Sequence, residues 1–293
     1  MTTSTKQLEF TRKARPLHWV GDGFPVRPII SPQDPPQDTS PFLLLDYAEP
    51  FHFDPAETPR GVGEHPHRGF ETVTIAYQGQ IDHRDSAGNA GTIGPGDVQW
   101  MTAASGVVHE ELHGAEFTRS GGNFEMIQLW VNLPASHKME PPRYQELAKE
   151  QIPIVDLPGR AGTLRVVAGQ VFGASGPAQT VTPINLWDID LKAGGQTKLE
   201  LPDNGSNTLL LVLSGQVQIN GGDKAGQGEL ARFQQEGTTI ALQAPEAAKL
   251  LLLNGAPIDE PVVAHGPFVM NDRAQISQAI RDYQNGQMGR LAS

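Results

Sequence analysis

The sequence contains no cysteine. Disulfide bonds, thiolate metal ligands and cysteine nucleophiles are therefore all excluded. Any metal ion would have to be held by histidine, carboxylate or backbone oxygen ligands. This absence directs the search for a metal or catalytic site toward histidine and acidic residues.

Long hydrophobic runs and positive charge are also scarce. The longest aliphatic runs, Leu209–Leu213 and Leu250–Leu253, fall far short of the ~18 residues of a membrane helix. The opening stretch MTTSTKQLEFTRKARP lacks the apolar core of a signal peptide, so we expect a cytoplasmic protein without a membrane partner. The net charge of −11 argues against direct binding to nucleic acid.

Glycine and proline are abundant instead, at 32 and 24 of the 293 residues. Their joint share of about 19% exceeds the usual ~12%. They divide the chain into short β-prone stretches roughly 10–12 residues apart, a spacing typical of a β-sandwich or β-barrel. The predicted strands lie at residues 42–47, 70–77, 80–85, 98–101, 106–112, 124–133, 164–168, 185–191, 208–213, 216–219, 230–233, 239–242 and 249–253.

The two halves of the chain share an order of turns. Tyr77–Gln80 aligns with Leu213–Gln216, and the segments on either side of these turns align in the same order. We therefore predict two copies of one β-barrel, the first within residues 1–135 and the second within residues 136–293.

Two segments depart from the strand pattern. The stretch Pro134–Pro158 is rich in proline and predicts a linker with a short helical piece around Tyr144–Lys149. The tail predicts a helix, because Asp272 is suited to its N-terminus and Gly286 to its end. Its apolar face would be formed by Ala274, Ile276, Ala279, Ile280 and Tyr283.

A His-x-His motif carries the strongest chemical signal. On a strand His65 and His67 point to the same face, and the intervening proline disfavours a helix. His109 and Glu111 repeat the same spacing, so two adjacent antiparallel strands would bring all four side chains to one inward face. Three imidazoles and a carboxylate suit Fe(II), Mn(II), Ni(II), Cu(II) or Zn(II). A lone His-x-His arises by chance, but two spaced pairs in a β-barrel predict a metal site.

Other candidate residues receive different predictions. Glu71 would share the facing of the His pair only if the strand continues unbroken through Gly69. We favour Glu111 as the ligand, so that Glu71 orients an imidazole or lies on the surface. Glu110 has the wrong parity and should face outward. Structural or surface roles are predicted for His18, His52, His83, His113 and His137.

The second half lacks these ligands. Eight of the nine histidines precede residue 138, and only His265 follows. The gapless alignment places Leu201, Asp203 and Ile240 where the first half has its three metal-site histidines. The second barrel is therefore predicted to bind no metal at this position.

Several long motifs resemble the pirin family of the cupin superfamily. They include HPHRGFETV (His65–Val73), PGDVQWMTAASGVVHEE (Pro95–Glu111), IQLWVNLP (Ile127–Pro134) and HGPFVMN (His265–Asn271). The resemblance implies an all-β bicupin: two tandem cupin-type, jelly-roll-like barrels with a short C-terminal helix. It also implies one mononuclear metal, with Fe(II) expected first and Mn, Ni, Cu, Co or Zn as alternatives. The family's ligands fall on His65, His67, His109 and Glu111.

The resemblance also implies an activity. Similar proteins act as quercetin 2,3-dioxygenases, which open a flavonol ring with O₂ and release carbon monoxide. The expected partners are then a small aromatic, flavonol-like substrate and O₂, and the metal would act as a Lewis acid. Glu111, or otherwise Glu71, could take the proton of the substrate hydroxyl.

Two alternatives stay open. Pirin-like proteins are also linked to transcription cofactor complexes and to metabolic enzymes, which would make this chain a metal-dependent regulatory module with a protein partner. A cupin that stores metal or converts another small aromatic compound is the third possibility. The fold alone does not decide among these functions.

Overall fold

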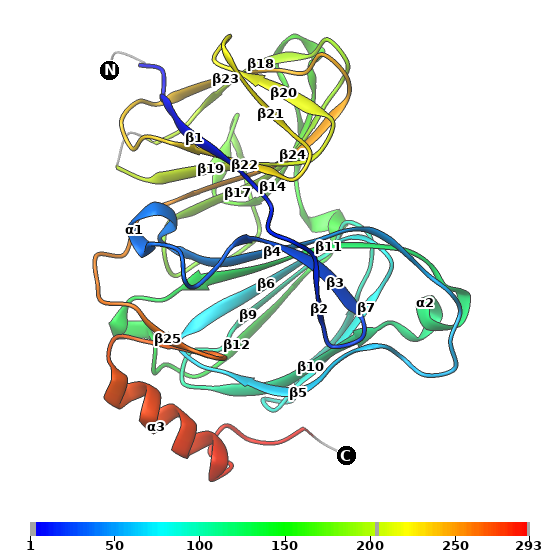
Figure 1. The fold of residues 1–293 in the computed structure, drawn as a ribbon, viewed down its shortest axis with the longest axis vertical. Helices are drawn as coiled ribbons and strands as arrows, with labels where there is room; N and C mark the ends of the chain where they lie inside the picture. Colours follow the sequence, from blue (N-terminus) through cyan, green and yellow to red (C-terminus); the bar gives the residue numbers. More distant parts are fainter. Residues whose placement is uncertain (1–3, 203–204, 292–293) are drawn as a thin grey trace. The chain divides into compact units, whose positions relative to one another are not determined.

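The computed structural model describes residues 4–202 and 205–291, which form two compact units (Figure 1). The N-terminal barrel contains residues 16–36, 42–149 and those from Ile258 onward. The C-terminal barrel contains residues up to Arg15, residues 37–41 and residues 150–257. The prediction divided the chain once, after residue 135, whereas each unit in the structure takes in a segment from the opposite end of the chain.

The N-terminal barrel holds most of the predicted first-half strands. Its elements are β2 (His18–Val20), β3 (Phe24–Ile30), β4 (Phe42–Phe53), β5 (Gly61–His67), β6 (Phe70–Gln78), β7 (Ile81–Asp85), β8 (Ala90–Ile93), β9 (Val98–Thr102), β10 (Val107–His113), α2 (Ala115–Ser120), β11 (Gly122–Asn132), η1 (Ala135–His137), β12 (Arg143–Leu147), β25 (Val263–His265), β26 (Phe268–Met270) and α3 (Arg273–Gln284).

The C-terminal barrel is built from the second-half strands and the first strand of the chain. Its elements are β1 (Leu8–Lys13), β13 (Ile154–Asp156), η3 (Pro158–Arg160), β14 (Gly162–Ala168), β15 (Gln170–Val171), β16 (Ala174–Ser175), β17 (Ile184–Leu191), β18 (Gln196–Glu200), β19 (Asn207–Ser214), β20 (Gln216–Ile219), β21 (Asp223–Gly226), β22 (Glu229–Phe233), β23 (Thr239–Gln243) and β24 (Ala248–Gly255). Two short helices, α1 (Pro36–Thr39) and η2 (Lys149–Gln151), each contain a point at which the chain passes from one unit to the other.

The two barrels have the same strand order. The N-terminal barrel has a seven-stranded sheet in the order β12-β9-β6-β11-β4-β3-β2 and a four-stranded sheet in the order β5-β10-β7-β8. The C-terminal barrel repeats this plan as β1-β22-β19-β24-β17-β14-β13 and β18-β23-β20-β21. The predicted all-β fold of two duplicated barrels is therefore confirmed. Burial alternates along β1, β7, β18 and β20, whereas β6, β9, β19 and β24 are buried almost throughout.

Backbone pairing explains why the chain ends exchange units. β1 pairs antiparallel with β22 from Leu8 to Lys13, so the start of the chain completes a sheet of the C-terminal barrel. Near the other end, Phe268 forms a parallel bridge with Arg68, and the Arg68 carbonyl accepts a hydrogen bond from Val269 N at 3.0 Å. The last segment of the chain is thereby joined to the N-terminal barrel.

Helix α3 agrees with its predicted ends. The Asp272 side chain accepts a hydrogen bond from Gln275 N at 2.8 Å and caps the N-terminus. Ile276 and Ala279 are buried as predicted and cluster with Val108 of β10. Tyr283 is exposed instead, and Asp282 is buried because it forms an ion pair with Arg68 at 2.7 Å.

The predicted helical piece around Tyr144–Lys149 is wrong. Arg143–Leu147 forms strand β12, which pairs with β9 at the edge of the large sheet of the N-terminal barrel. Strand pairing overrides the local sequence signal there, since Tyr144 packs into the cluster of Met101 and Val107. None of the helices in the described ranges is both long and apolar enough to cross a membrane.

Gly69 permits the close approach of the last segment, and we expect its replacement by alanine to be strongly destabilising. Gly69 has φ +90°, and an added Cβ would lie 1.9 Å from the carbonyl oxygen of Val269. Left-handed strain costs roughly 1–2 kcal/mol for a residue with a side chain, and the clash adds to it. Urea unfolding should therefore show a loss of about 3 kcal/mol or more.

Gly88 provides a matched control, because it has φ +91° but no atom within 4 Å of an added Cβ. Gly88→Ala should show the backbone strain alone, roughly 1–2 kcal/mol. Equal losses for the two variants would contradict the importance of the contact with Val269.

Candidate metal centre

Three of the predicted ligands lie together on the small sheet of the N-terminal barrel. β5 and β10 pair antiparallel, with His65 opposite His109 and His67 opposite Val107. The ring centroids are 4.2 Å apart for His65 and His109, and 4.8 Å apart for His67 and His109. One nitrogen of each imidazole lies within 4.8 Å of the others. The i, i+2 spacing on β5 and the register with β10 produce this arrangement.

Each imidazole uses its Nδ1 atom for a protein contact. His65 Nδ1 donates to the Gly63 carbonyl at 2.8 Å, and His67 Nδ1 donates to the Pro267 carbonyl at 3.4 Å. His109 Nδ1 lies 3.4 Å from Nδ1 of His83, while its Nε2 is buried with no hydrogen-bond partner among the described residues. A carbonyl only accepts, so His65 and His67 keep an Nε2 lone pair. A metal cation would satisfy these nitrogens and the orphaned Nε2 of His109.

Burial keeps two of these imidazoles neutral. Desolvation lowers the pKa of His67 and His109 well below the usual value, and the neighbouring histidines lower it further. A neutral imidazole is the form that binds a metal, so these two histidines would not have to lose a proton to bind one at neutral pH. The donor set therefore fits a divalent transition metal.

Glu111 follows His109 by two residues on β10, and the register between β10 and β5 shifts between these two residues. Its side chain is buried, Oε2 accepts a hydrogen bond from Gln128 Nε2 at 3.1 Å, and Thr74 Oγ1 lies 3.1 Å from Oε1. Its carboxylate belongs to a second set, with His109 and His83, whose ligand atoms lie within 4.8 Å of one another. Glu111 therefore shares His109 with the three-histidine cluster but is not grouped with His65 or His67, and its role as a metal ligand stays a prediction.

Glu71 is neither a surface residue nor close to an imidazole. β5 ends at His67 and β6 begins at Phe70, so Glu71 does not continue the alternation of His65 and His67. Glu71 lies three residues from Thr74, the β6 residue that contacts Glu111, and therefore on the opposite face of β6. Glu71 is fully buried, accepts a hydrogen bond from Thr102 Oγ1 at 2.6 Å, and has its pKa raised by burial. Both predicted roles for Glu71, on the surface or behind an imidazole, are therefore wrong.

The sequence pattern predicts a structural or surface role for His83, yet this residue lies beside the histidine cluster. His83 on β7 is buried beside His109 and directly opposite Glu111. Its signal was the His-x-Asp spacing with Asp85, which places both side chains on the inward face of a strand. Another histidine, His113, is structural as predicted: it packs among phenylalanines, and its Nε2 lies 2.9 Å from the Gly23 carbonyl.

Two further residues discussed in the sequence, Glu110 and His265, do not face the histidine cluster. Glu110 points outward as predicted and forms an ion pair with Arg84. His265 is exposed at the end of β25, opposite Phe268. In the motif HGPFVMN, the residue that contacts the histidine cluster is Pro267, whose backbone carbonyl accepts from His67 Nδ1. A backbone contact of this kind is not indicated by a pattern of side chains.

The C-terminal barrel has an aliphatic interior at the corresponding place. Its β18 and β23 pair Leu199 with Ile240, just as β5 and β10 pair two histidines. By this strand pairing Leu199 corresponds to His65 and Leu201 corresponds to His67. The gapless sequence alignment had instead matched His65 to Leu201, so the structural correspondence differs from it by two residues. Leu199, Leu201 and Ile240 all belong to one buried hydrophobic cluster. Asp203, which the alignment had matched to His67, lies outside the described residues.

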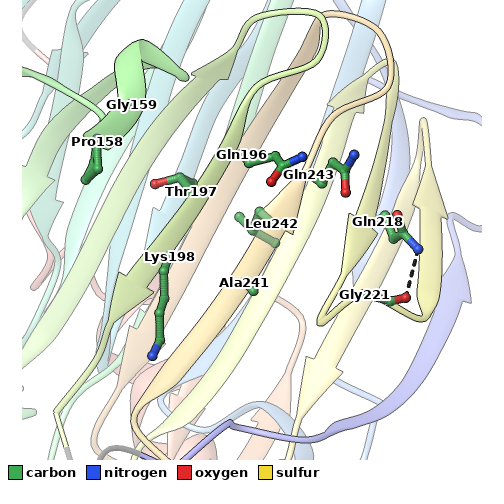
Figure 2. A pocket seen from close by; sticks show the side chains of 10 residues that line it. All are labelled: Pro158, Gly159, Gln196, Thr197, Lys198, Gln218, Gly221, Ala241, Leu242 and Gln243. Atoms are coloured by element: carbon green, nitrogen blue, oxygen red, sulfur yellow. Dashed lines mark hydrogen bonds between the residues drawn. The ribbon is translucent and has the colours of Figure 1, made fainter.

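A depression of about 490 Å³ lies on the C-terminal barrel (Figure 2). Figure 2 shows it over β18, β20 and β23, with the Gln218 amide donating to the Gly221 carbonyl at 2.9 Å. Lys198 is the one charged side chain in its lining. The depression therefore has none of the histidine and carboxylate side chains that cluster in the N-terminal barrel.

Two family models match the chain. The pirin model matches residues 23–131, and the model of the pirin C-terminal cupin domain matches residues 186–289. The first match includes the three clustered histidines and Glu111. The second covers most of the C-terminal barrel together with β25, β26 and α3.

Known proteins are similar over nearly the whole chain. A Pseudomonas aeruginosa protein provisionally named quercetin 2,3-dioxygenase is 53% identical over 269 residues, covering 92% of this chain and 93% of that protein. The human protein named pirin is 37% identical over 259 residues, covering 86% and 84%. A crystal structure of a quercetin 2,3-dioxygenase from Acinetobacter baumannii matches with a TM-score of 0.95 and 47% identity, covering 99% and 100%. These matches confirm the cupin-type fold, and the chain belongs to the pirin family.

Proposed function

We propose that this chain is a metal-dependent dioxygenase of the quercetin 2,3-dioxygenase type, with His65, His67, His109 and Glu111 as its metal ligands. The observation that carries the proposal is the convergence of three imidazoles whose Nδ1 atoms are all occupied by protein contacts. The similarity to proteins named quercetin 2,3-dioxygenase supplies the substrate class, a flavonol together with O₂.

A bound metal would supply Lewis acidity to a substrate hydroxyl and a path for electrons to O₂. The chain's own residues would do the rest. Glu111, oriented by Gln128 and the Thr74 hydroxyl, would accept the hydroxyl proton. Phe70 and Trp130 pack against each other, with ring centroids 4.3 Å apart, and each contacts the His67 ring. This aromatic wall would shield the centre from water and offer an apolar face to a flat substrate.

Three finer assignments belong to the proposal. Fe(II) is the metal we expect first, because the family resemblance implies iron and three imidazoles with a carboxylate suit it. The cytoplasm is the compartment we expect, and a chain without cysteine does not need an oxidising compartment in order to fold. A regulatory role with a protein partner stays an alternative, for which no surface feature of the described residues argues.

The test is oxygen uptake by purified protein that has been stripped of metal and reloaded separately with Fe(II), Mn(II), Ni(II), Cu(II) or Co(II). At least one loaded form should consume quercetin with matching O₂ uptake and release of carbon monoxide, and the stripped protein should not. Absence of uptake with every metal, in protein shown to have bound it, would rule out this activity.

A further inference from the structure

We propose that Asp85 and His83 are positioning residues that fix the tautomer of His109, so that His109 presents Nε2 to the metal. The inference rests on the proposed function, because it assumes a metal at the histidine cluster. It concerns residues outside the predicted ligand set, which sequence analysis had assigned no role at the site.

The three side chains form a continuous row inside the N-terminal barrel. β7 and β10 pair antiparallel, with Asp85 opposite His109 and His83 opposite Glu111. His83 Nε2 lies 3.5 Å from Asp85 Oδ2, and His83 Nδ1 lies 3.4 Å from His109 Nδ1. The side chains of His83 and Asp85 are each only 1% exposed, so water does not compete for these contacts.

The carboxylate of Asp85 determines which nitrogen carries the proton in His83, and His83 in turn determines this for His109. His83 Nε2, like His109 Nε2, has no hydrogen-bond partner among the described residues, and its contact with Asp85 Oδ2 at 3.5 Å is an ion-pair contact. An ionised carboxylate at that distance attracts the proton of His83 to Nε2 by its charge and can only accept from it. Nδ1 of a neutral His83 is then an acceptor, and the facing Nδ1 of His109 must donate to it. His109 is left with an unprotonated Nε2, the buried nitrogen for which the described residues provide no partner. The row thus prepares that nitrogen to bind a cation.

Asp85 and His83 are both held in place. Asp85 Oδ1 accepts hydrogen bonds from Ala87 N at 2.9 Å and Asn89 N at 3.0 Å, and Oδ2 accepts from Asn89 Nδ2 at 2.8 Å. Burial alone would raise the pKa of Asp85, but its interactions with His83 and Asn89 outweigh burial and lower it. The His83 ring stacks on Tyr144, with centroids 5.2 Å apart and planes 15° apart. The carboxylate is therefore ionised and the imidazole oriented before any metal binds.

Without this row, His109 would be free to place its proton on Nε2. That proton would then occupy the position the metal needs, and its removal would compete with binding. Loss of residues that orient a metal-binding histidine typically weakens metal affinity by about 10–100-fold. We expect a loss of this size when the acceptor at position 83 is removed.

The test uses full-length His83→Phe, which keeps a flat ring against Tyr144 but has no nitrogen. Long-range ¹H–¹⁵N NMR of metal-free protein reports directly which nitrogen of His109 carries the proton, and competition with a chelator gives the Zn(II) affinity. Wild type should show the Nδ1–H tautomer. His83→Phe should shift His109 toward Nε2–H and weaken Zn(II) binding about 10–100-fold. His83→Gln, whose amide oxygen can accept, should restore part of both.

His113→Phe is the matched control, because His113 is buried on the same strand as His109 but contacts none of the three clustered histidines. It should leave the tautomer and the affinity unchanged. Asp85→Asn tests the other end of the row while keeping an oxygen for Ala87 N and Asn89 N, and it covers the case in which His83→Phe does not fold.

The outcomes separate the two hypotheses. An unchanged tautomer and an unchanged Zn(II) affinity in folded His83→Phe or Asp85→Asn would overturn the positioning role. Wild-type protein that binds neither Zn(II) nor Fe(II) at the histidine cluster would overturn the proposed function itself, whatever the tautomer of His109.

Discussion

His67→Ala is expected to lower the metal content of the purified protein from about one ion per chain to background. Flavonol-dependent O₂ uptake should fall by at least ~10³-fold, because a Lewis acid contributes several kcal/mol and each 1.36 kcal/mol is a factor of ten. His67 is a buried member of the imidazole cluster, and its Nδ1 donates to the Pro267 carbonyl. Elemental analysis and oxygen-electrode measurements on the same preparation provide the two readouts.

His52→Ala is the appropriate control, since His52 is exposed and, among the described residues, its ring contacts the polar side chains of Asn123 and Asp54 rather than the histidine cluster. It should retain metal and activity. A His67→Ala protein that keeps a full complement of metal would contradict the ligand assignment. A protein that loses metal yet still consumes quercetin would separate the ligand assignment from the proposed activity.

Lys138→Met is expected to cost about 2–4 kcal/mol of unfolding free energy at pH 9, because it leaves buried acceptors without a donor. Lys138 is 1% exposed, and its Nζ lies 2.6 Å from the Gly69 carbonyl oxygen, 2.7 Å from Asn132 Oδ1 and 3.1 Å from the Val269 carbonyl oxygen. The ammonium form can donate to all three acceptors, and the neutral amine can donate to two of them. These acceptors belong to three separate segments of the N-terminal barrel. The lysine therefore joins the end of β11, the loop after His67 and strand β26.

The penalty should depend on pH in a defined direction. Burial lowers the pKa of Lys138 from 10.5 to about 7. Between these values the unfolded chain binds a proton that the folded chain does not, so rising pH stabilises the folded wild type. The cost of Lys138→Met should thus be larger at pH 9 than at pH 6.5. Urea unfolding at both values checks this, with exposed Lys224→Met as control; a penalty that shrinks as the pH rises would contradict it.

Local patterns were sufficient to predict most of the fold. Gln216–Ile219 was predicted as a strand with the bounds that β20 has, because Gly215 and the turn after Ile219 delimit it. The helix capped by Asp272 was predicted from the same kind of signal. By contrast, the strand Arg143–Leu147 follows from pairing with β9, which is a tertiary interaction that its own residues do not encode.

In the candidate site, too, some residues could be predicted from local spacing and others depend on tertiary contacts. His65, His67 and Glu111 follow from period-2 spacing, which is a local property of a strand. The orientation of Glu71 depends on the break at Gly69, and that break is required because the Val269 carbonyl occupies the space of a Cβ. Contacts between residues so far apart in sequence leave no periodic signal, which is why sequence analysis did not identify Pro267 or the pairing of His83 with His109.

The exchange of chain ends has a consequence for synthesis on the ribosome. The Pro267 carbonyl that contacts His67 is 200 residues further along the chain. At about 5–20 residues per second, the histidines emerge roughly 10–40 s before this partner does. The contact between His67 and its backbone acceptor can therefore form only after most of these residues have been synthesised. A chain truncated after β24 would contain every strand of both seven-stranded sheets and still leave His67 without its acceptor.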